Sequence, residues 1–205
     1  MPKKSPLTGK EQIYGTELSL KNAQVLAFWR WAFSDLRMND IRGVFAEWLV
    51  ALLLDIPLNT RDSWGEWDLT TENGVSIEVK SSAYLQAWKQ KRVSRISFSG
   101  LRGKRLNAES NLYAKEKTYN ADLYAFCAQI EKDPKKWDAL DLEQWRFYLL
   151  KREELIPLQQ NSISQNRLAK LTPEMNAEEF QRRAKELIAE IAQRKTNSRN
   201  LLSMV

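Results

Sequence analysis

The chain has 205 residues, a formal net charge of +6 and 43% hydrophobic residues, enough for one domain of ordinary size with a sizeable core. It contains no histidine and a single cysteine, Cys127. This composition excludes histidine-dependent hydrolases, histidine- or cysteine-ligated zinc sites and an intramolecular disulfide. Acid–base or metal chemistry must therefore rest on Asp, Glu, Lys or Tyr, and oxygen ligands favour hard cations such as Mg²⁺ or Mn²⁺.

The sequence shows no signal-peptide core and no apolar run long enough to span a membrane. One cysteine also fits a reducing compartment. We therefore expect a cytoplasmic protein with no membrane partner.

Apolar residues at helical spacing predict a helix within residues 19–36 and a second helix over residues 39–55. Asn39 or Asp40 is expected to cap the second helix, and Pro57 follows its end. The second helix is apolar nearly all round, a pattern typical of a buried helix.

Strand patterns begin after this helix. Residues 64–71 and 75–81 flank the turn sequence Glu72-Asn73-Gly74, which strongly indicates a hairpin. Residues 121–130 form a near-continuous apolar run, as in a central strand. Helices followed by strands and then mixed elements predict an α/β fold with a central mixed β-sheet flanked by helices.

The other segments give weaker patterns. Residues 92–100 and 145–155 are expected to contain further strands, residues 111–120 a short helix or a loop, and residues 162–171 a segment that becomes helical toward its end.

The C-terminal part predicts an amphipathic helix from about residue 177 to residue 194. Asn176 and Glu179 have capping-box spacing, and residues 196–205 are expected to fray. We divide the chain into a core domain, residues 1–175, and this C-terminal helix in residues 176–205, which packs on the core or forms a homodimer contact. Its apolar stripe consists of Phe180, Ala184, Leu187, Ile188 and Ile191.

One segment after the hairpin is strongly basic. Residues 89–105 hold seven Lys or Arg residues and no acidic residue. A solvated basic loop would look the same, but such a segment is also typical of one that contacts phosphates. The residues are Lys89, Lys91, Arg92, Arg95, Arg102, Lys104 and Arg105.

The length of the hairpin turn decides whether two carboxylates share a face of the sheet. If the turn is the three residues 72–74, Thr71 pairs with Val75 and Asp68 lies opposite Glu78. A two-residue Asn-Gly turn would shift the register by one and place the two carboxylates on opposite faces.

Lys80 follows two residues after Glu78, so both point to the same face of the strand. Two close carboxylates repel each other unless a cation lies between them, and a divalent metal would relieve that repulsion. A lysine beside them can orient a nucleophile or neutralise developing negative charge. The plain alternative is a solvated Glu–Lys pair worth about 0.2–1 kcal/mol.

A third acid, Glu47, interrupts the apolar second helix. Glutamate is rarely buried without a partner, and Gly43 and Ala51 leave space around it. Glu47 therefore either points into a polar pocket or forms a salt bridge with Arg42 or another basic group.

Glu47 on the first core helix, Asp68 on a strand and Glu78-Val79-Lys80 on the next strand together resemble the PD-(D/E)xK nuclease superfamily, which has the restriction-endonuclease-like fold. The resemblance covers roughly residues 39–130, and its order of elements continues with a helix and another strand.

The chain departs from this family at one position, because Trp67 stands where a proline usually precedes the motif aspartate. Two further features are similar to relatives. Gln86 lies where some members have a glutamine after the motif lysine, and Ser81-Ser82 is similar to small polar pairs found there.

By this resemblance, Asp68 and Glu78 would bind Mg²⁺, or Mn²⁺, together with the carbonyl of Val79. Lys80 would position or activate the attacking water, and Glu47 would hold a second metal or a water. The reaction would be hydrolysis of phosphodiester bonds in DNA, of restriction, mobile-element or repair type, without an organic cofactor.

The resemblance also implies that the basic segment, with Trp88 beside it, follows the DNA backbone; Trp88 is otherwise expected in the core. Two other classes of function stay open at this point. The first is a DNA-binding module on the same fold with little or no turnover. The second is a scaffold protein whose main surface is the C-terminal helix.

Overall fold

The computed structural model describes residues 6–15, 17–21, 23–104, 106–107 and 112–202. Within these residues, no helix is both long and apolar enough to cross a membrane. The helices are α1 (Val25–Phe33), α2 (Asn39–Leu53), α3 (Arg152–Leu155), α4 (Gln165–Leu168) and α5 (Ala177–Leu202), with 3₁₀ turns at Leu142–Gln144 and Ile156–Leu158. The strands are β1 (Leu69–Thr70), β2 (Ser76–Ala83), β3 (Ser97–Ser99), β4 (Leu106–Asn107), β5 (Leu112–Tyr113), β6 (Leu123–Gln129), β7 (Trp145–Lys151) and β8 (Ser162–Ser164).

The central sheet has four strands in the order β1-β2-β6-β7. β1 is antiparallel to β2, β2 is parallel to β6, and β6 is antiparallel to β7. This arrangement confirms the predicted α/β fold with a mixed sheet. Every residue of β6 is buried, as expected for a central strand with packed layers on both faces.

The hairpin turn has the three-residue length on which the shared face of the carboxylates depends. Leu69 pairs with Ile77 in the β1–β2 ladder, and the Thr71 N–H donates to the Val75 carbonyl over 3.0 Å. Gly74 closes the turn at a φ of +72°, where a side chain would be strained. The same register, continued by one residue, places Asp68 beside Glu78.

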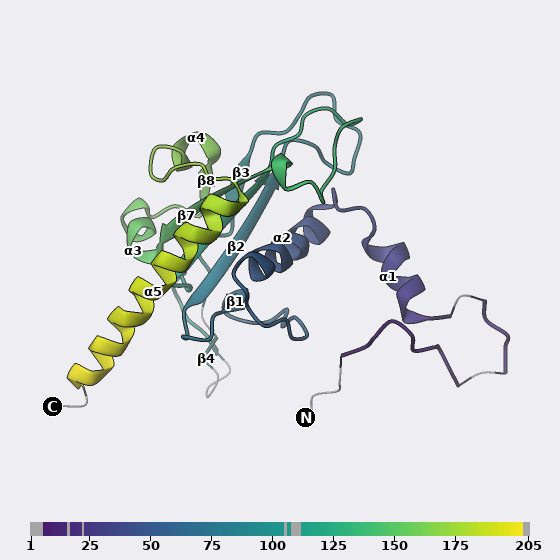
Figure 1. The fold of residues 1–205 in the computed structure, drawn as a ribbon, viewed down its shortest axis with the longest axis horizontal. Helices are drawn as coiled ribbons and strands as arrows, with labels where there is room; N and C mark the ends of the chain where they lie inside the picture. The colour runs from purple at the N-terminus through teal and green to yellow at the C-terminus, as the bar shows by residue number, and fades with distance from the viewer. Residues whose placement is uncertain (1–5, 16, 22, 105, 108–111, 203–205) are drawn as a thin grey trace.

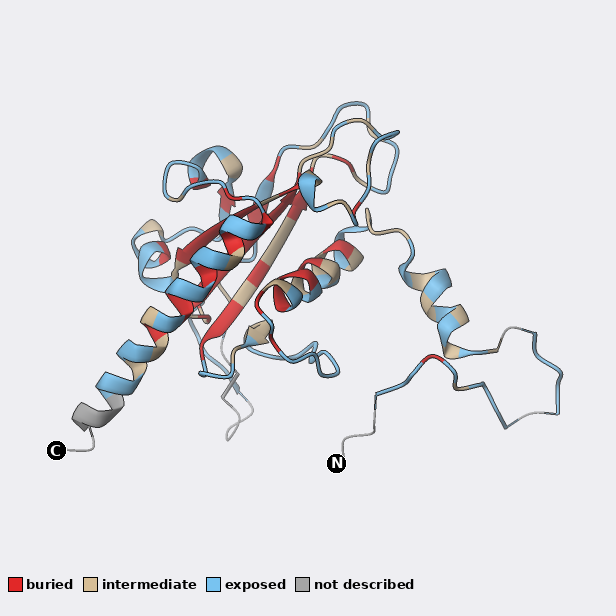
Figure 2. Cartoon of the chain, viewed as in Figure 1, coloured by how far each residue is buried: buried red, intermediate tan, exposed pale blue. Residues whose placement is uncertain are grey.

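Two apolar layers cover the two faces of the sheet, and Figure 2 shows the buried residues concentrated there. On one face, Ile77 and Val79 of β2 pack with α2 and α5. On the other face, Phe126 of β6 packs with Phe98 of β3. Glu78 and Lys80, which alternate with Ile77 and Val79, therefore lie on the β3 side.

The connection from β2 to β6 differs from the expected order. Parallel strands usually need a helical crossover, but the described residues between β2 and β6 contain no helix. Instead, the chain turns back along β2 and forms β3, which pairs with β8 in a small second sheet. The β4–β5 ladder follows before β6 begins. Residues 112–113 are thus a short strand, where the sequence suggests a helix or loop.

The helix predicted within residues 19–36 is confirmed, and α1 covers Val25–Phe33. None of its residues is buried, and Phe28 and Trp31 are exposed. Figure 1 shows α1 and the segment before it extending away from the sheet. Its helical spacing therefore reflects an apolar helix that has no core against which to pack.

The expected N-cap of α2 is wrong. Met38 precedes the helix in an extended conformation, and no side chain caps the helix end. The Asn39 Oδ1 is engaged elsewhere, because it accepts a hydrogen bond from Arg42 Nη2 over 2.6 Å. The helix ends at Leu53, before Pro57.

The expectation that α2 is buried all round is also wrong. Ala46, Leu49 and Val50 face the sheet and are buried, but Val44 and Trp48 are exposed. The reason is that only one face of α2 meets the sheet, and none of the described elements covers the opposite face.

α5 packs on the core domain along its predicted apolar stripe. All five stripe residues are buried, and Phe180 lies 4.9 Å from Phe147 of β7 between ring centroids. The capping box also forms, since Asn176 and Glu179 exchange backbone-to-side-chain hydrogen bonds of 2.9 and 3.0 Å. The helix continues to Leu202, so the expected fraying from residue 196 is wrong within the described residues.

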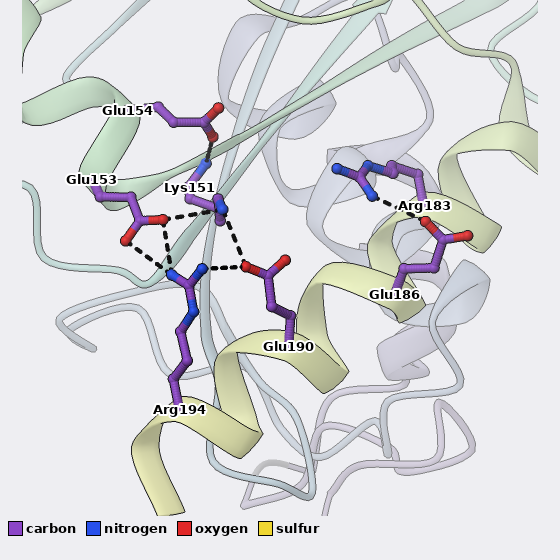
Figure 3. A network of polar contacts seen from close by, with 7 residues as sticks. All are labelled: Lys151, Glu153, Glu154, Arg183, Glu186, Glu190 and Arg194. Carbon is purple, nitrogen blue, oxygen red and sulfur yellow. Dashed lines mark hydrogen bonds and ion pairs between the residues drawn. The ribbon is translucent and has the colours of Figure 1, made fainter. Parts of the chain in front are cut away.

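Ion pairs connect α5 to α3 and to Lys151 at the end of β7. Figure 3 shows Lys151 and Arg194 bridging Glu153 of α3 and Glu190 of α5. Exposed pairs of this kind contribute little, about 0–1 kcal/mol each. The buried stripe therefore fixes α5, and the ion pairs only set its register against α3.

Two of the remaining predicted strands are shorter than expected, and the segment expected to become helical toward its end does so. The expected strand at residues 92–100 is confined to β3, the one at 145–155 ends at Lys151 and becomes α3, and the segment 162–171 divides into β8 and α4.

Candidate functional site

The hairpin holds Asp68 at the edge of the sheet, immediately before β1. Its Oδ2 accepts a hydrogen bond from the backbone N–H of Val79 over 2.7 Å. The carboxylate thus reaches across the end of the short strand β1 onto β2. Val79 is buried, so this contact anchors the acid to the rigid centre of the sheet.

Glu78 and Lys80 lie on β2 next to Asp68. Lys80 Nζ and Glu78 Oε1 are 2.6 Å apart, and both side chains are mostly shielded, at 22% exposure for the lysine and 17% for the glutamate. The chain returning from β3 passes over the lysine, because a Cβ added at Gly100 would lie 3.9 Å from Lys80 Nζ. The pair is therefore packed under a loop, which argues against a freely solvated Glu–Lys pair.

Glu47 points from α2 toward the same edge of the sheet, but a basic partner holds it. Arg61 Nε and Nη2 donate to the two carboxylate oxygens over 2.5 and 2.7 Å. The sequence leaves a salt bridge open and suggests Arg42; the partner is Arg61, from the loop between α2 and β1. Arg42 is buried on a different turn of the helix and bonds elsewhere.

The electrostatics of the site centre on Asp68. Burial, and after it the negative charges of Glu78 and Glu47, raise the pKa of Asp68 to about 7. The Val79 N–H and the charge of Lys80 act in the opposite direction but do not cancel the effect. When Asp68 is ionised, the three carboxylates carry one more charge than Arg61 and Lys80 neutralise, and the raised pKa of Asp68 reflects this excess.

A pocket of about 440 Å³ opens beside these acids. Glu47, Arg61 and Asp68 line its polar side, while Trp48 and Leu58 belong to its apolar side. Exposed α2 residues thus form a wall of the pocket. Asp68 lines this pocket, whereas Glu78 and Lys80 do not.

Asp68 and Glu78 could supply some, but not all, of the ligands that a divalent cation needs. Leftover negative charge at a half-buried carboxylate pair is what an added cation would neutralise. In the part of the chain that the structure describes, however, no three Asp, Glu or Cys side chains are arranged to hold a metal ion. Glu47 is turned to Arg61, which leaves Asp68, Glu78 and backbone oxygens such as that of Val79 as the donor set.

The basic segment runs back along the Glu78–Lys80 face of β2. It starts with Lys89 and Arg92 beyond the end of β2, and the Ser97 N–H donates to Ser82 Oγ over 3.2 Å. It then passes Lys80 at Gly100. Lys89, Lys91, Arg92, Arg95 and Lys104 are exposed, whereas Arg105 lies outside the described residues.

Arg102 differs from the other basic residues of the segment. Its guanidinium donates to the Lys117 carbonyl over 2.7 Å and lies over the ring of Tyr119. Arg102 therefore supports the loop after β3 and is less free to bind a ligand than its neighbours.

Ser81 and Gln86, which the resemblance places near the motif lysine, do not lie beside the carboxylates of Asp68 and Glu78. Ser81 pairs with Cys127 and alternates with Lys80, so it lies on the opposite face of β2. Gln86 lies past the end of β2, where its Oε1 accepts a bond from Arg42 Nη1 over 3.4 Å. Trp88 is 57% exposed, so the expected core position is wrong.

Sequence reasoning missed Arg61 and Gly100. A single arginine in a polar loop gives no spacing pattern, and Gly100 approaches Lys80 only because the chain reverses after β2. The chain matches no protein-family model, and no curated protein sequence matches it. What the fold and the site define is an α/β protein whose mixed sheet carries two carboxylates and a lysine at its edge.

Proposed function

We propose that the protein is a Mg²⁺-dependent deoxyribonuclease that hydrolyses phosphodiester bonds. The observation that carries this proposal is the joining of Asp68, Glu78 and Lys80 at one edge of the sheet. Asp68 is tied to the backbone of β2, and Lys80 is tied to Glu78. These three residues are the ones that resemble the two acids and the lysine of the PD-(D/E)xK motif.

Each side chain has a role that its position supports. Asp68 and Glu78, with the Val79 carbonyl, would hold the cation, which when bound polarises a phosphoryl oxygen and lowers the pKa of a water. Lys80 donates to that water or to the phosphate, since its ammonium already lies beside Glu78. Glu47 is paired with Arg61 and would join the donor set only after a rearrangement.

The substrate must be a polyanion that reaches both the edge of the sheet and the basic segment. The stretch from Ser97 to Gly100 passes along the Glu78–Lys80 face of β2, and exposed lysines and arginines stand on both sides of this stretch in the chain. Phosphate contacts of this kind give affinity without base sequence information. This distribution supports a nucleic-acid backbone as substrate, in preference to a small phosphate ester.

A second candidate is a DNA-binding module on the same fold with little turnover. The bidentate pairing of Glu47 with Arg61 favours it, because this pairing removes one carboxylate from the donor set. The half-buried carboxylates Asp68 and Glu78 beside Lys80 favour the nuclease, since binding of a polyanion alone has no need of two carboxylates at the site.

The test is a cleavage assay on plasmid, linear duplex and single-stranded DNA with Mg²⁺ or Mn²⁺. Wild type should cleave at least one substrate, and chelation should abolish cleavage. Asp68→Ala and Lys80→Ala should each lower the rate at least about 100-fold. Glu72→Ala and Lys115→Ala, at exposed positions outside the site, serve as matched controls and should leave the rate unchanged.

Activity that survives both Asp68→Ala and Lys80→Ala would remove the site assignment. DNA binding by wild type, without cleavage of any substrate with either metal, would favour the binding module.

A further inference from the structure

A second pocket lies past the carboxyl end of β2, on the far side of Lys80 from Asp68. It has a volume of about 450 Å³, within the range of small-molecule sites. β2 continues for three residues beyond Lys80, which corresponds to about 10 Å, before the chain enters the wall of this pocket. The pocket is therefore separate from the carboxylates but lies on the same strand.

The wall of this pocket combines cations with aromatic rings. Arg37, Lys89, Arg92 and Lys132 line it, and no acidic side chain does. Arg37 is paired with Asp35 over 3.0 Å. Among the described residues, no carboxylate forms an ion pair with Lys89, Arg92 or Lys132, although Lys132 lies over the ring of Tyr84.

Arg42 adds a buried positive charge behind the wall. It is 5% exposed, and its hydrogen bonds go to neutral oxygens of Arg37, Asn39 and Gln86. Its Nε has no partner among the described residues. A buried charge without a counter-charge costs folding stability, so its presence points to an anion that binds nearby. Burial lowers the pKa of Arg42 to about 10, which still leaves it charged at neutral pH.

The aromatic side of the pocket suits a flat base. Trp88 lines the pocket and is 57% exposed, so a large part of its surface is available for stacking. Trp137 also lines it, and its buried Nε1 has no hydrogen-bond partner in the described part of the chain. One face of Trp137 is already covered, because the Arg37 guanidinium lies 5.6 Å from its ring centroid. Trp88 is thus the ring left for a ligand.

We propose that this pocket binds one unpaired nucleotide of the DNA strand, with its base against Trp88 and its phosphate against Arg92, Lys89 and Lys132. A duplex backbone would present phosphates to a surface but could not place a base in a hollow lined by Trp88 and Leu85. Aromatic stacking beside a basic groove is typical of single-strand recognition. The inference rests on the proposed function for the identity of the polymer and extends it to DNA with a single-stranded segment.

The test measures binding in EDTA, so that cleavage does not enter. Fluorescence anisotropy compares a single-stranded DNA oligonucleotide with a duplex of the same sequence. Trp88→Ala should weaken binding of the single strand at least about five-fold and that of the duplex less than about two-fold. Trp31→Ala, at a tryptophan that is 84% exposed on α1, is the matched control and should change neither affinity.

A charge variant tests the phosphate side of the pocket. Arg92→Ala with Lys132→Ala should lower the log–log slope of single-strand affinity against salt by about 0.7 for each phosphate that the variant no longer neutralises. Arg182→Ala with Lys170→Ala removes two exposed charges outside the pocket and should leave this slope unchanged.

Three outcomes would overturn the proposal. They are unchanged single-strand binding in Trp88→Ala, an equal loss for both forms of DNA, and Trp88-dependent binding of deoxyadenosine monophosphate without any effect on the strand. Wild type that binds no DNA in EDTA would also overturn it. Failure of the proposed function would appear separately, as cleavage that is absent or that survives Asp68→Ala.

Discussion

The middle of β2 and the region past its carboxyl end carry side chains of opposite charge. Near its middle, Glu78 and Asp68 leave negative charge that Lys80 and Arg61 do not fully neutralise. Past its carboxyl end, the buried Arg42 stands without a carboxylate partner among the described residues, behind a pocket lined by cations.

The difference between these regions shows how uncompensated charge identifies the partner of a site. Burial makes an unpaired charge of either sign costly, so neither region is explained by stability alone. The acidic region favours a cation and the basic region favours a phosphate. One strand that ties the two regions together, about 10 Å apart along its backbone, suits a polymer that needs both at once.

Glu78→Gln should have the largest effect and should separate the two regions. It removes a carboxylate from the acidic region and leaves Lys80 without its ion pair. We expect Mg²⁺-dependent cleavage to fall at least about 100-fold, while single-strand affinity in EDTA stays within about two-fold. An equal loss of affinity and cleavage would show that the two regions do not act independently.

Asp68→Asn tests the charge of the acidic region through the pH dependence of stability. The ordinary pKa of this carboxyl is 3.8, and in the folded protein it is about 7. The folded state therefore holds the proton more tightly, so Asp68 lowers stability as pH rises from about 4 through about 7. In EDTA at pH 8 we expect the variant to gain about 1–3 kcal/mol in urea denaturation, because one pKa unit corresponds to about 1.4 kcal/mol.

The gain should disappear at pH 4, where Asp68 holds its proton in the folded protein. Asp40→Asn, at an exposed position, should follow wild type at every pH. A variant whose stability changes with pH as that of wild type does would exclude a raised pKa at Asp68.

Arg42→Met tests the buried charge of the basic region. Methionine keeps much of the side-chain volume, and replacement of a buried charge by an apolar group is often close to neutral for folding. We expect single-strand affinity to fall about three- to ten-fold, with the urea midpoint nearly unchanged. Arg42→Lys keeps the charge and should recover part of the affinity. Full affinity in Arg42→Met would show that the buried charge of Arg42 does not contribute to ligand binding.

Arg61→Ala should have the smallest effect on cleavage and stability, and it tests whether Glu47 contributes to metal binding. Arg61 is 39% exposed, so its loss should change stability by less than about 1 kcal/mol. Release of Glu47 should lower the Mg²⁺ concentration for half-maximal cleavage a few-fold if Glu47 joins the donor set. An unchanged Mg²⁺ requirement would leave Glu47 as a structural partner of Arg61.

The candidate site divides into parts that the sequence predicts and parts that it does not. The turn residues are compatible with two registers, and only the structure shows that the turn has three residues, with Gly74 in a left-handed conformation. Glu47 is expected to need a partner, but Arg61 is not identifiable because the loop between α2 and β1 has no periodic pattern. The resemblance predicts Gln86 near the carboxylates. In the structure, β2 ends at Ala83, and Gln86 lies beyond it, away from Asp68 and Glu78.

By itself, the sequence determined the mixed α/β fold, the buried strand β6, the α5 stripe and the absence of histidine chemistry. These features follow from apolar periodicity and composition, which act over neighbouring residues. Only the tertiary structure decided which charges meet. The return of the chain after β2 brings Gly100 over Lys80, and the approach of α2 to the end of β2 joins Arg42 to Gln86, 44 positions away in sequence. Such contacts depend on the path of the chain through space, which no local pattern encodes.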